Sequence, residues 1–563
     1  MRLPAGSKFI LPERNLAMLR YTRKIAAFIM SALILLSLGG CGSDSGDDSV
    51  EPMPTGEGGV PLREMAVADD KFTLNYSPGE GFHPITSKST DNLLFMPLIY
   101  ESLFNVDETM ECTPNLCTGY EINPDNEVTY TFKIDTSRMF HDGTLLTAKD
   151  VERSIIAARV STLYGDRLNQ NIAGISSIGD EELVITLYKP NTQFPALLNI
   201  PIYKHESRDE DFPEGTGPYM LDEARTKLIR FDSHPDFKKL PIATIHLREF
   251  ATSDEIISAF ENKELDLVIN DPAGMRNLGY GNPIKHYYQT TAMHYLGFNM
   301  ESDFLYLAAH RSAVGYAVNR SGIVTNIMGG SGTEAALPLL PVSKLYNQNY
   351  AAALEFSPEK SKSILDAQAI KDNDGDGFRD IKKSDDEIEE IVINFIVNNE
   401  NSTKVGAARD IVKNLNNIGL DVNLRELSWA DFQQALQSKD FDMYYGEIKL
   451  TADFDLTRLL TRKGLLNYGG ITDESYGMKI DDYLKSPEET RQMYADAMYK
   501  YIGDTAPVIP IAFHKKQVLT HRDVVFEMEP TQYNIFNKFT NWVIDITADS
   551  GTVIVTETPE EDR

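Results

Sequence analysis

The spacing of apolar residues predicts alternating strands and helices over most of this chain. Apolar and more polar residues alternate over Val128–Ile134 and Glu182–Tyr188, as expected for half-buried strands. Between these segments, His141–Gly143 supplies a turn, and Thr147 with Asp150 matches a capping box that starts a helix. This region is therefore predicted to contain at least two strands and one helix.

Two strand–helix–strand units are predicted further along the chain. The first has a strand, a helix started by Ser253 and a second strand, at Thr244–Phe250, Asp254–Asn262 and Leu265–Ile269. The second unit, which is more clearly defined, is followed by another helix and strand; these five elements lie at Ile391–Val397, Ser402–Ile418, Leu420–Leu424, Trp429–Gln437 and Phe441–Glu447. Such units predict at least two α/β lobes, each with a pair of parallel strands.

The first forty residues have the features of a secretory signal peptide. Three basic residues precede the apolar run Ile25–Leu38, and small residues follow it. The run is too short to cross a hydrocarbon core of roughly 30 Å, which needs about 20 helical residues. Cys41 directly after Leu-Gly-Gly resembles a bacterial lipobox, in which the thiol is lipidated and becomes the mature N-terminus. An ordinary signal peptide with an incidental cysteine is the alternative, and translation could start at Met1 or at Met18.

Composition changes the picture in two ways. Residues 41–67 begin with a stretch rich in Ser, Asp, Gly, Glu and Pro, which predicts a flexible acidic tether. The chain carries a formal net charge of −30, and loss of residues 1–40 would leave −35. A surface this acidic repels nucleic acid phosphates, so nucleic acid is excluded as a partner. The length, with 42% hydrophobic residues, predicts two or three domains with large cores.

Apart from Cys41, the chain contains only Cys112 and Cys117. An even pair in an exported protein is a disulfide candidate, and two free buried thiols are equally compatible with the sequence. No His or Cys pair with zinc-ligand spacing lies nearby, so a zinc site is not predicted.

One motif resembles an EF-hand-type calcium loop. Carboxylates occupy its positions 1, 3, 5 and 9, at Asp372, Asp374, Asp376 and Asp380. Position 12, where the loop needs a bidentate Glu, is Lys383. A Gly/Asp-rich surface turn is therefore the favoured interpretation, and calcium binding is the weaker one.

No motif for catalysis stands out. The ten histidines are scattered, and no pair has the i, i+4 spacing of zinc enzymes. A nucleophile elbow, a phosphate loop and a dinucleotide fingerprint are all missing from the sequence. We therefore predict no catalytic residue, no resident metal and no cofactor.

Several stretches resemble, in the same order, the family 5 extracellular solute-binding proteins of ABC importers, which include oligopeptide- and dipeptide-binding proteins. The matching stretches are Tyr100–Phe104, Tyr130–Phe132, Phe140–Gly143, Leu146–Val151, Gly215–Tyr219, Tyr295–Asn299, Arg311 with Tyr316–Arg320, and Pro507–Pro510. The resemblance covers roughly residues 75–522. The glycines and prolines of Phe140–Gly143 and Gly215–Tyr219 suit turns, so we interpret these two stretches as fold-building.

The resemblance implies an α/β, bilobed periplasmic-binding-protein-like fold with mixed sheets in the two lobes and a two-strand hinge. The hinge strands would cross near Tyr295–Asn299 and Pro507–His514. Domain I would combine residues 68–97, 200–297 and 515–563, domain II would be residues 98–199, and domain III would be residues 298–514. Domain II is the extra domain that peptide binders carry.

The resemblance also implies a ligand site. Family members hold an extended peptide by strand addition next to an Ala-Asp pair, whose Asp binds the peptide ammonium. The segment aligned with that site, after the predicted strand Phe441–Glu447, is Lys449, Leu450, Thr451, Ala452 and Asp453. Tyr295 and Asn299, at the chain crossing, are further candidate ligand residues. The residues before the pair differ from those frequent in peptide binders, which leaves other ligands open.

The sequence thus predicts a monomeric, lipid-anchored, extracytoplasmic subunit of an ABC importer that binds oligopeptides and catalyses nothing. Its partners would be the peptide, the permease and ATPase subunits, and the membrane through Cys41. Alternatives are the same fold binding a nickel chelate, haem or a sugar, or a sensory or adhesive lipoprotein.

Overall fold

The computed structural model describes residues 71–274, 282–384, 387–522 and 524–546. The predicted signal peptide, the acidic tether and the lipidation site Cys41 lie outside the described residues. Among the helices that are described, none combines the length and apolar character needed to cross a bilayer.

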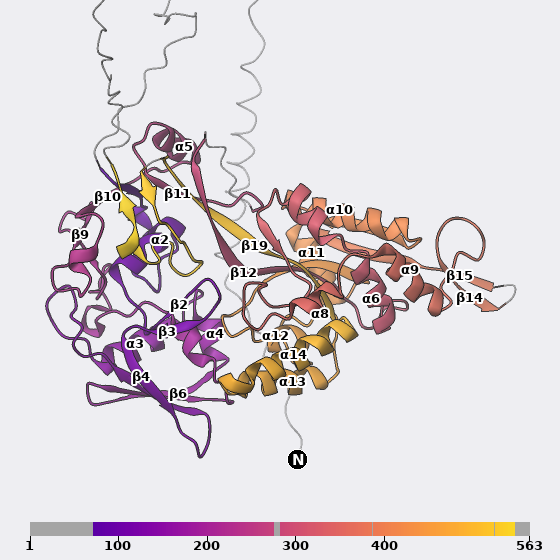
Figure 1. Cartoon of the computed structure of the whole chain (residues 1–563), viewed down its shortest axis with the longest axis horizontal. Coiled ribbons are helices and arrows are strands. Elements are labelled where there is room, and N and C mark those ends of the chain that lie inside the picture. The colour runs from indigo at the N-terminus through magenta and orange to yellow at the C-terminus, as the bar shows by residue number, and fades with distance from the viewer. Residues whose placement is uncertain (1–70, 275–281, 385–386, 523, 547–563) are drawn as a thin grey trace, which may run out of the picture. The chain divides into compact units, whose positions relative to one another are not determined.

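The first sheet is formed by segments that lie far apart in the sequence (Figure 1). Its strands, in spatial order, are β1 (Thr73–Asn75), β10 (Thr244–Arg248), β9 (Lys227–Arg230) and β8 (Tyr219–Leu221). The strand β1 runs parallel to β10, and the other pairs are antiparallel. The neighbouring helices are α2 (Thr90–Ile99) and α5 (Ser253–Glu261), with short 3₁₀ segments η2 (Pro78–Glu80), η4 (His205–Ser207) and η5 (Phe237–Lys239).

The first predicted strand–helix–strand unit has the expected elements, but the predicted pairing is wrong. The strand β10 pairs with β1, whereas β11 (Leu267–Asn270) joins a different sheet and runs antiparallel to its neighbour. The helix between them is capped by Thr252, whose hydroxyl accepts from the backbone N–H of Glu255, and not by Ser253. Periodicity predicts strands but does not identify their partners.

A second sheet is built from the region that follows α2. Its spatial order is β4 (Cys117–Ile122), β5 (Thr129–Ile134), β7 (Glu182–Leu187) and β6 (Ile172–Ile178), all antiparallel. The hairpin β2 (Phe104–Val106) and β3 (Cys112–Pro114) precedes it, and α3 (Ala148–Arg159), α4 (Gly165–Asn169) and η3 (Phe194–Leu198) complete this region. The two alternating strands predicted from the sequence are β5 and β7.

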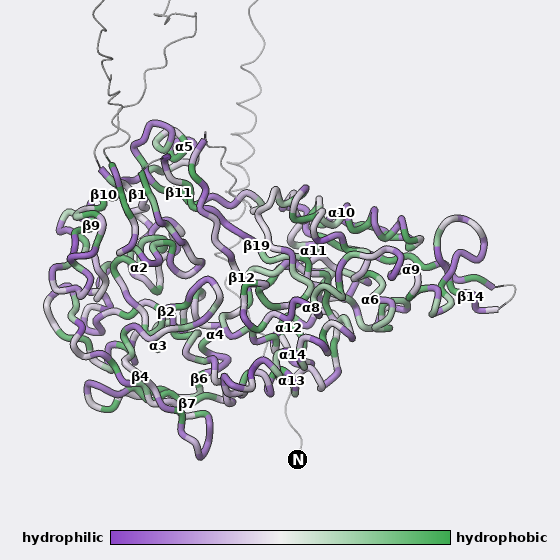
Figure 2. Tube along the Cα trace, viewed as in Figure 1, coloured by the Kyte–Doolittle hydropathy of each residue, from purple (hydrophilic) through white to green (hydrophobic). Residues whose placement is uncertain are grey.

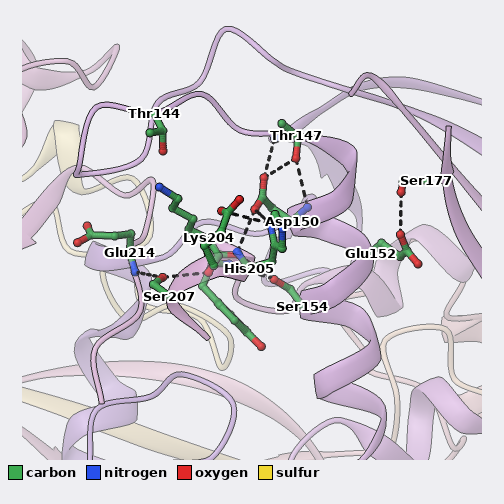
Figure 3. A network of polar contacts seen from close by, with 12 residues as sticks. Thr144, Thr147, Asp150, Glu152, Ser154, Ser177, Lys204, His205, Ser207 and Glu214 are labelled. Atoms are coloured by element: carbon green, nitrogen blue, oxygen red, sulfur yellow. Dashed lines mark hydrogen bonds and ion pairs between the residues drawn. The ribbon is translucent and has the colours of Figure 1, made fainter. Parts of the chain in front are cut away.

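The predicted capping box is confirmed at the start of α3. The Asp150 carboxylate accepts from the backbone N–H of Thr147 at 2.9 Å and from its hydroxyl at 2.6 Å. The other Asp150 oxygen accepts from the backbone N–H of His205 and lies 2.7 Å from its Nδ1 (Figure 3). The buried Asp150 therefore joins the helix start to the segment that leads back to the first sheet.

The two stretches interpreted as fold-building contact each other. The backbone N–H of His141 donates to the carbonyl of Gly215 at 2.9 Å, and His141 Nε2 lies 3.0 Å from the carbonyl oxygen of Gly217. A Cβ at Gly217 would collide with the backbone of Ile99, so this position requires glycine for close approach. These contacts agree with a structural role for both stretches.

The largest sheet contains the second predicted unit. Its spatial order is β11, β19 (Val508–Thr520), β12 (Ile284–Phe298), β18 (Met443–Lys449), β16 (Val392–Asn398) and β17 (Asp421–Leu427), with β13 (Gly332–Glu334) paired to β19. The strand β16 runs parallel to both β17 and β18, which confirms the parallel pairing predicted for this unit.

Helices surround this sheet. They include α10 (Ser402–Asn417) and α11 (Trp429–Ser438), which were both predicted, and α6 (Ala308–Tyr316), α7 (Arg320–Gly322), the π-helical segment η6 (Ile323–Ile327), α8 (Gln348–Ala352), α9 (Pro358–Ala367), α12 (Thr457–Leu460), α13 (Ser475–Lys485) and α14 (Glu488–Thr505). The remaining elements are β14 (Asp380–Ser384), β15 (Glu387–Glu390), β20 (Val525–Phe526), β21 (Val543–Ile544) and η7 (Phe539–Asn541).

Two long strands, β12 and β19, connect the two lobes (Figure 1). Each lobe has its own apolar core: one joins residues 72–288 to residues 518–542, and the others lie mainly within residues 293–513. The pairing of β12 with β19 changes register between Gln289 and Met293 and again after His294. Apolar stretches follow the strands of both lobes, whereas the loop at β14 is largely hydrophilic (Figure 2).

The cysteine pair does not form a disulfide. Cys112 and Cys117 are both free thiols, one half-buried on β3 and the other buried at the start of β4. Cys117 Sγ donates to the carbonyl of Gly119, and burial raises the pKa of both thiols. Each cysteine pairs with a different strand, Cys112 with Val106 and Cys117 with Ile134, so the structure adopts the free-thiol alternative.

Candidate functional site

Two cavities meet at Lys449 and Gln532, where the lobes face each other. One, of about 640 Å³, lies along β12, β18 and β19, and we call it the hinge cavity. The other, of about 500 Å³, is lined by α4 and the first lobe together with Tyr533, and we call it the Arg167 cavity. Both volumes fall within the roughly 300–1,000 Å³ typical of ligand sites. Since Lys449 and Gln532 line both, the two cavities are adjacent.

Lys449 is the predicted ligand residue that the structure places in these cavities. It ends β18 opposite Ala292 of β12. Its side chain is exposed at the end of the strand, and desolvation by the surrounding cavity walls, with the nearby charges of Arg167 and Lys516, lowers the pKa of Lys449. Because the charged form of Lys449 is destabilised here, a negatively charged ligand group would be a favourable partner for it.

Arg167 on α4 adds a second cation that the sequence analysis did not select. It lines the Arg167 cavity, and its Nε is buried without a hydrogen-bond partner. One terminal nitrogen donates to the carbonyl of Asn199 at 3.0 Å. Burial lowers the pKa of Arg167. No sequence motif marked this arginine, because its importance depends on the fold bringing α4 to Lys449.

Asp453 lies between the lobes and lines neither cavity. It is 1% exposed, and its Oδ2 accepts from Asn191 Nδ2 at 2.9 Å. The hydroxyl of Thr451 donates to Oδ1 at 2.5 Å. Burial and the neighbouring carboxylate of Asp455 raise the pKa of Asp453 to about 6. Each carboxylate oxygen thus accepts a side-chain hydrogen bond from the protein in this arrangement.

The other residues of the aligned segment serve the fold. Leu450 donates its backbone N–H to the carbonyl of Thr291 at 3.0 Å, and the Thr291 hydroxyl donates to the Leu450 carbonyl at 2.6 Å. Leu450 and Ala452 are buried in an apolar core. Leu450 therefore extends the β12–β18 pairing, and its backbone groups already have partners within the protein.

The side chains of Tyr295 and Asn299 also contact other groups of the protein. The Tyr295 hydroxyl lies 3.3 Å from that of Tyr444 within the apolar core, and burial raises the pKa of Tyr295 to about 12. Asn299 donates from Nδ2 to the carbonyl of Phe441 at 3.1 Å. Neither residue lines the hinge cavity or the Arg167 cavity. A role in ligand contact remains a prediction for both.

The loop that resembles a calcium site forms a compact acidic turn. Carboxylates of Asp372, Asp374 and Asp380 come within 4.8 Å of one another, and so do those of Asp374, Asp376 and Glu390. Lys383, at position 12, pairs with Glu389 at 2.5 Å. The oxygens of the buried Asp380 accept from the backbone and side chain of Asn373. Calcium binding by this loop remains a prediction.

Additional direct contacts join the two lobes around Asp453. The backbone N–H of Thr192 donates to the carbonyl of Leu484 at 2.8 Å, and its hydroxyl donates to the carbonyl of Ser486 at 2.6 Å. Two ion pairs, Lys189–Asp481 at 2.9 Å and Arg458–Asp166 at 2.8 Å, lie at the exposed rim. Asp453 and Asn191 therefore form the buried part of a larger contact.

Comparison with known proteins identifies the family. Residues 111–455, more than half of the chain, match the family described as bacterial extracellular solute-binding proteins, family 5 Middle. The chain is 22% identical over 449 residues to the oligopeptide-binding protein AppA of Bacillus subtilis, covering 75% of this chain and 79% of AppA.

Solved structures show the same bilobed fold. HbpA2 from Haemophilus parasuis superposes with a TM-score of 0.70 at 18% identity, covering 84% of this chain and 99% of HbpA2. NikZ from Campylobacter jejuni, in complex with Ni(L-His), gives a TM-score of 0.59 at 19% identity, covering 85% and 100%. The predicted fold class is confirmed, and these two likenesses concern the fold alone.

Proposed function

Because this chain belongs to the bacterial extracellular solute-binding proteins of family 5, we propose that it captures oligopeptides between its lobes and delivers them to the permease of an ABC importer. The observation that carries this proposal is the pair of adjacent cavities between the lobes, with Lys449 lining both and the unpartnered Nε of Arg167 in one of them. The similarity to the oligopeptide-binding protein AppA supports a peptide as the ligand.

The cavities suit a ligand with a carboxylate. Lys449 and the unpartnered Nε of Arg167 both face the space beside Gln532. A peptide carboxylate in this space would accept charge-assisted hydrogen bonds from both cations, which are stronger than those between neutral groups. We assign the ligand's C-terminal or side-chain carboxylate to Lys449 and Arg167.

The peptide ammonium is assigned to Asp453. In the present arrangement Asn191 from the other lobe satisfies this carboxylate at 2.9 Å. When the lobes separate, Asn191 withdraws and Asp453 is left without a partner for Oδ2. An ammonium is a stronger partner for a carboxylate than a neutral amide, so a bound peptide would replace Asn191 there.

Membrane attachment through Cys41 is part of the proposal. The lipobox-like sequence places the anchor at the start of the mature chain, and the acidic segment to residue 67 would hold the binding body away from the lipid. The permease and ATPase subunits would be separate chains, to which the closed, loaded protein docks.

The test uses a randomised pentapeptide library in three forms: free, N-acetylated and C-amidated. Calorimetry should show binding of the free form, and both blocked forms should bind more weakly. Asp453→Ala should weaken free peptides by roughly 2–5 kcal/mol, which is about 30- to several-thousand-fold, while acetylated peptides should lose much less. Lys449→Gln should show the same selectivity for the C-amidated form.

Asn191→Ala is the matched control. It removes the partner of Asp453 without removing the carboxylate, so free and acetylated peptides should respond to it equally. Equal losses for both peptide forms in Asp453→Ala would refute the ammonium assignment. Failure of every peptide to bind the unmodified protein or to raise its melting temperature would refute peptide capture itself.

A further inference from the structure

Three side chains from neighbouring strands gather on one face of the large sheet, within the hinge cavity. His294 of β12 is the direct register partner of Glu447 of β18. On its other side His294 faces Ala512 of β19, and His514 lies two residues further along that strand. Because side chains alternate between faces with a period of two, His514 points to the same face as Ala512. Each of His294, Glu447 and His514 offers a ligand atom within 4.8 Å of the other two.

His294 has a buried nitrogen without a hydrogen-bond partner. His294 is 2% exposed and its Nε2 lacks a hydrogen bond, whereas His514 is 5% exposed and its Nε2 lies 2.6 Å from Asp271 Oδ1. Leaving a buried polar atom unpaired is costly, and native proteins rarely do so without a bound group. His294 Nδ1 is held by the hydroxyl of Tyr445 at 3.1 Å, so the unpaired Nε2 is left to face the cavity.

The donor set matches a particular class of ion. Two imidazoles and one carboxylate suit borderline divalent transition metals such as zinc, cobalt and nickel, whereas calcium prefers oxygen donors alone. Asp271 Oδ1 lies 2.6 Å from His514 Nε2, which resembles the carboxylate–histidine pairs that orient metal ligands.

We propose that His294, Glu447 and His514 bind one divalent transition-metal cation at the point where the chain crosses between the lobes. This function goes beyond peptide capture and does not require it, although the site lies in one of the two cavities proposed for the peptide. The ligands come from both crossing strands and from β18, next to the register change that follows Gln289. A bound ion would cross-link these strands and stiffen the connection between the lobes.

One neighbouring cation opposes the ion. Lys404 Nζ lies 2.6 Å from Glu447 Oε2, which leaves the second carboxylate oxygen for the metal. A divalent cation bound to Glu447 would be repelled by the nearby Lys404 charge. Removing that charge should therefore strengthen metal binding. The proposal therefore predicts that removing a ligand lowers the metal affinity and that removing Lys404 raises it.

The test is a titration of the untagged full chain, stripped with a chelator, with cobalt(II) followed by visible absorption and zinc followed by calorimetry. Excess calcium in the buffer would compete for sites built from oxygen donors, among which the Asp372–Asp380 loop is a candidate. One equivalent should bind, with a cobalt spectrum that indicates nitrogen ligands. His294→Ala and His514→Ala should each weaken binding at least tenfold, and Lys404→Gln should strengthen it.

Glu447→Gln tests the site even where the histidine variants fail to fold, because Glu447 is partly exposed and its substitution disturbs the fold less. This variant should also weaken metal binding at least tenfold. His286→Ala, on the same strand but outside the cluster, should leave the affinity unchanged. Absence of binding to the unmodified chain, or unchanged affinity in both His294→Ala and His514→Ala, would overturn the metal site. Peptide calorimetry in the presence of chelator is independent of this result, so the two proposals can fail separately.

Discussion

The side-chain amide of Asn191 donates a 2.9 Å hydrogen bond to the carboxylate of Asp453, joining segments that are 262 residues apart. The contact is buried, and it links domain II, as predicted from the sequence, to the segment aligned with the peptide-ammonium site. Closure of the lobes and availability of Asp453 are therefore coupled, because the same carboxylate serves the lobe contact and the proposed ligand.

The buried Asp453 should make stability depend on pH. Its pKa of about 6 in the folded chain lies above the ordinary 3.8, so the folded state binds the proton more tightly than the unfolded state. The stabilisation is present below pH 4 and is lost as the pH rises through 6. The free energy of unfolding of Asp453→Asn, relative to that of the wild type, should therefore rise by on the order of 2 kcal/mol between pH 4 and pH 7. Urea unfolding at both pH values measures this, and a constant difference would contradict it.

His294 should produce the opposite trend. Burial lowers its pKa to about 4, so the unfolded chain binds this proton more readily. Stability contributed by the neutral imidazole is present above pH 6.5 and is lost as the pH falls toward 4. In metal-free buffer, the free energy of unfolding should fall by on the order of 2–3 kcal/mol more in the wild type than in His294→Gln between pH 7 and pH 4. Unfolding curves of the two proteins that stay parallel from pH 7 to pH 4 would count against it.

Ligand should shift the lobes toward closure. The buried Asn191–Asp453 bond and the Thr192 contacts hold the lobes together, whereas the exposed ion pairs at the rim contribute little. Asn191→Ala should therefore enlarge the radius of gyration of the ligand-free protein in small-angle X-ray scattering, and a bound peptide should reduce it. Removing the exposed pair with Lys189→Ala is the control and should leave the radius unchanged. An identical radius of gyration for Asn191→Ala and the wild type would show that the Asn191–Asp453 bond does not keep the lobes closed.

Cys112 and Cys117 should react as free thiols. Without reductant, iodoacetamide should label both after denaturation, as read by mass spectrometry of the peptides. In the folded protein both should react more slowly than after denaturation, because burial raises the pKa of each thiol and disfavours its thiolate. Adding reductant should leave the melting temperature of the unmodified protein nearly unchanged, as it should for the double variant Cys112→Ser, Cys117→Ser, which is the control. Labelling that appears only after reduction would show that the two are bridged.

Cys41→Ala should prevent the proposed lipid attachment. The variant should accumulate as uncleaved precursor or be released to the medium, because the lipobox-like sequence would lack its acceptor thiol. Fractionation with mass spectrometry of the mature N-terminus provides the measurement. Cys112→Ser, which leaves the lipobox-like sequence intact, is the control. A Cys41→Ala protein that stays in the membrane fraction at the mature mass would refute the anchor.

Local sequence determined most of the elements. The alternation at β5 and β7, the helical spacing of α10 and the capping box at Thr147 each depend on residues a few positions apart. Side-chain period and capping chemistry are local properties, so they can be read without knowledge of the fold. The ordered motifs also identified the family and its bilobed architecture.

Partnership between distant segments was decided only by the tertiary structure. Local pattern could not show that β10 and β11 join different sheets, that Asn191 satisfies Asp453, or that Cys112 and Cys117 remain apart. The clearest case is His294 and Glu447, which the sequence separates by more than 150 positions and the β12–β18 register places directly opposite each other. Strand register is set by packing of both faces over the whole sheet, so no short stretch of sequence contains it.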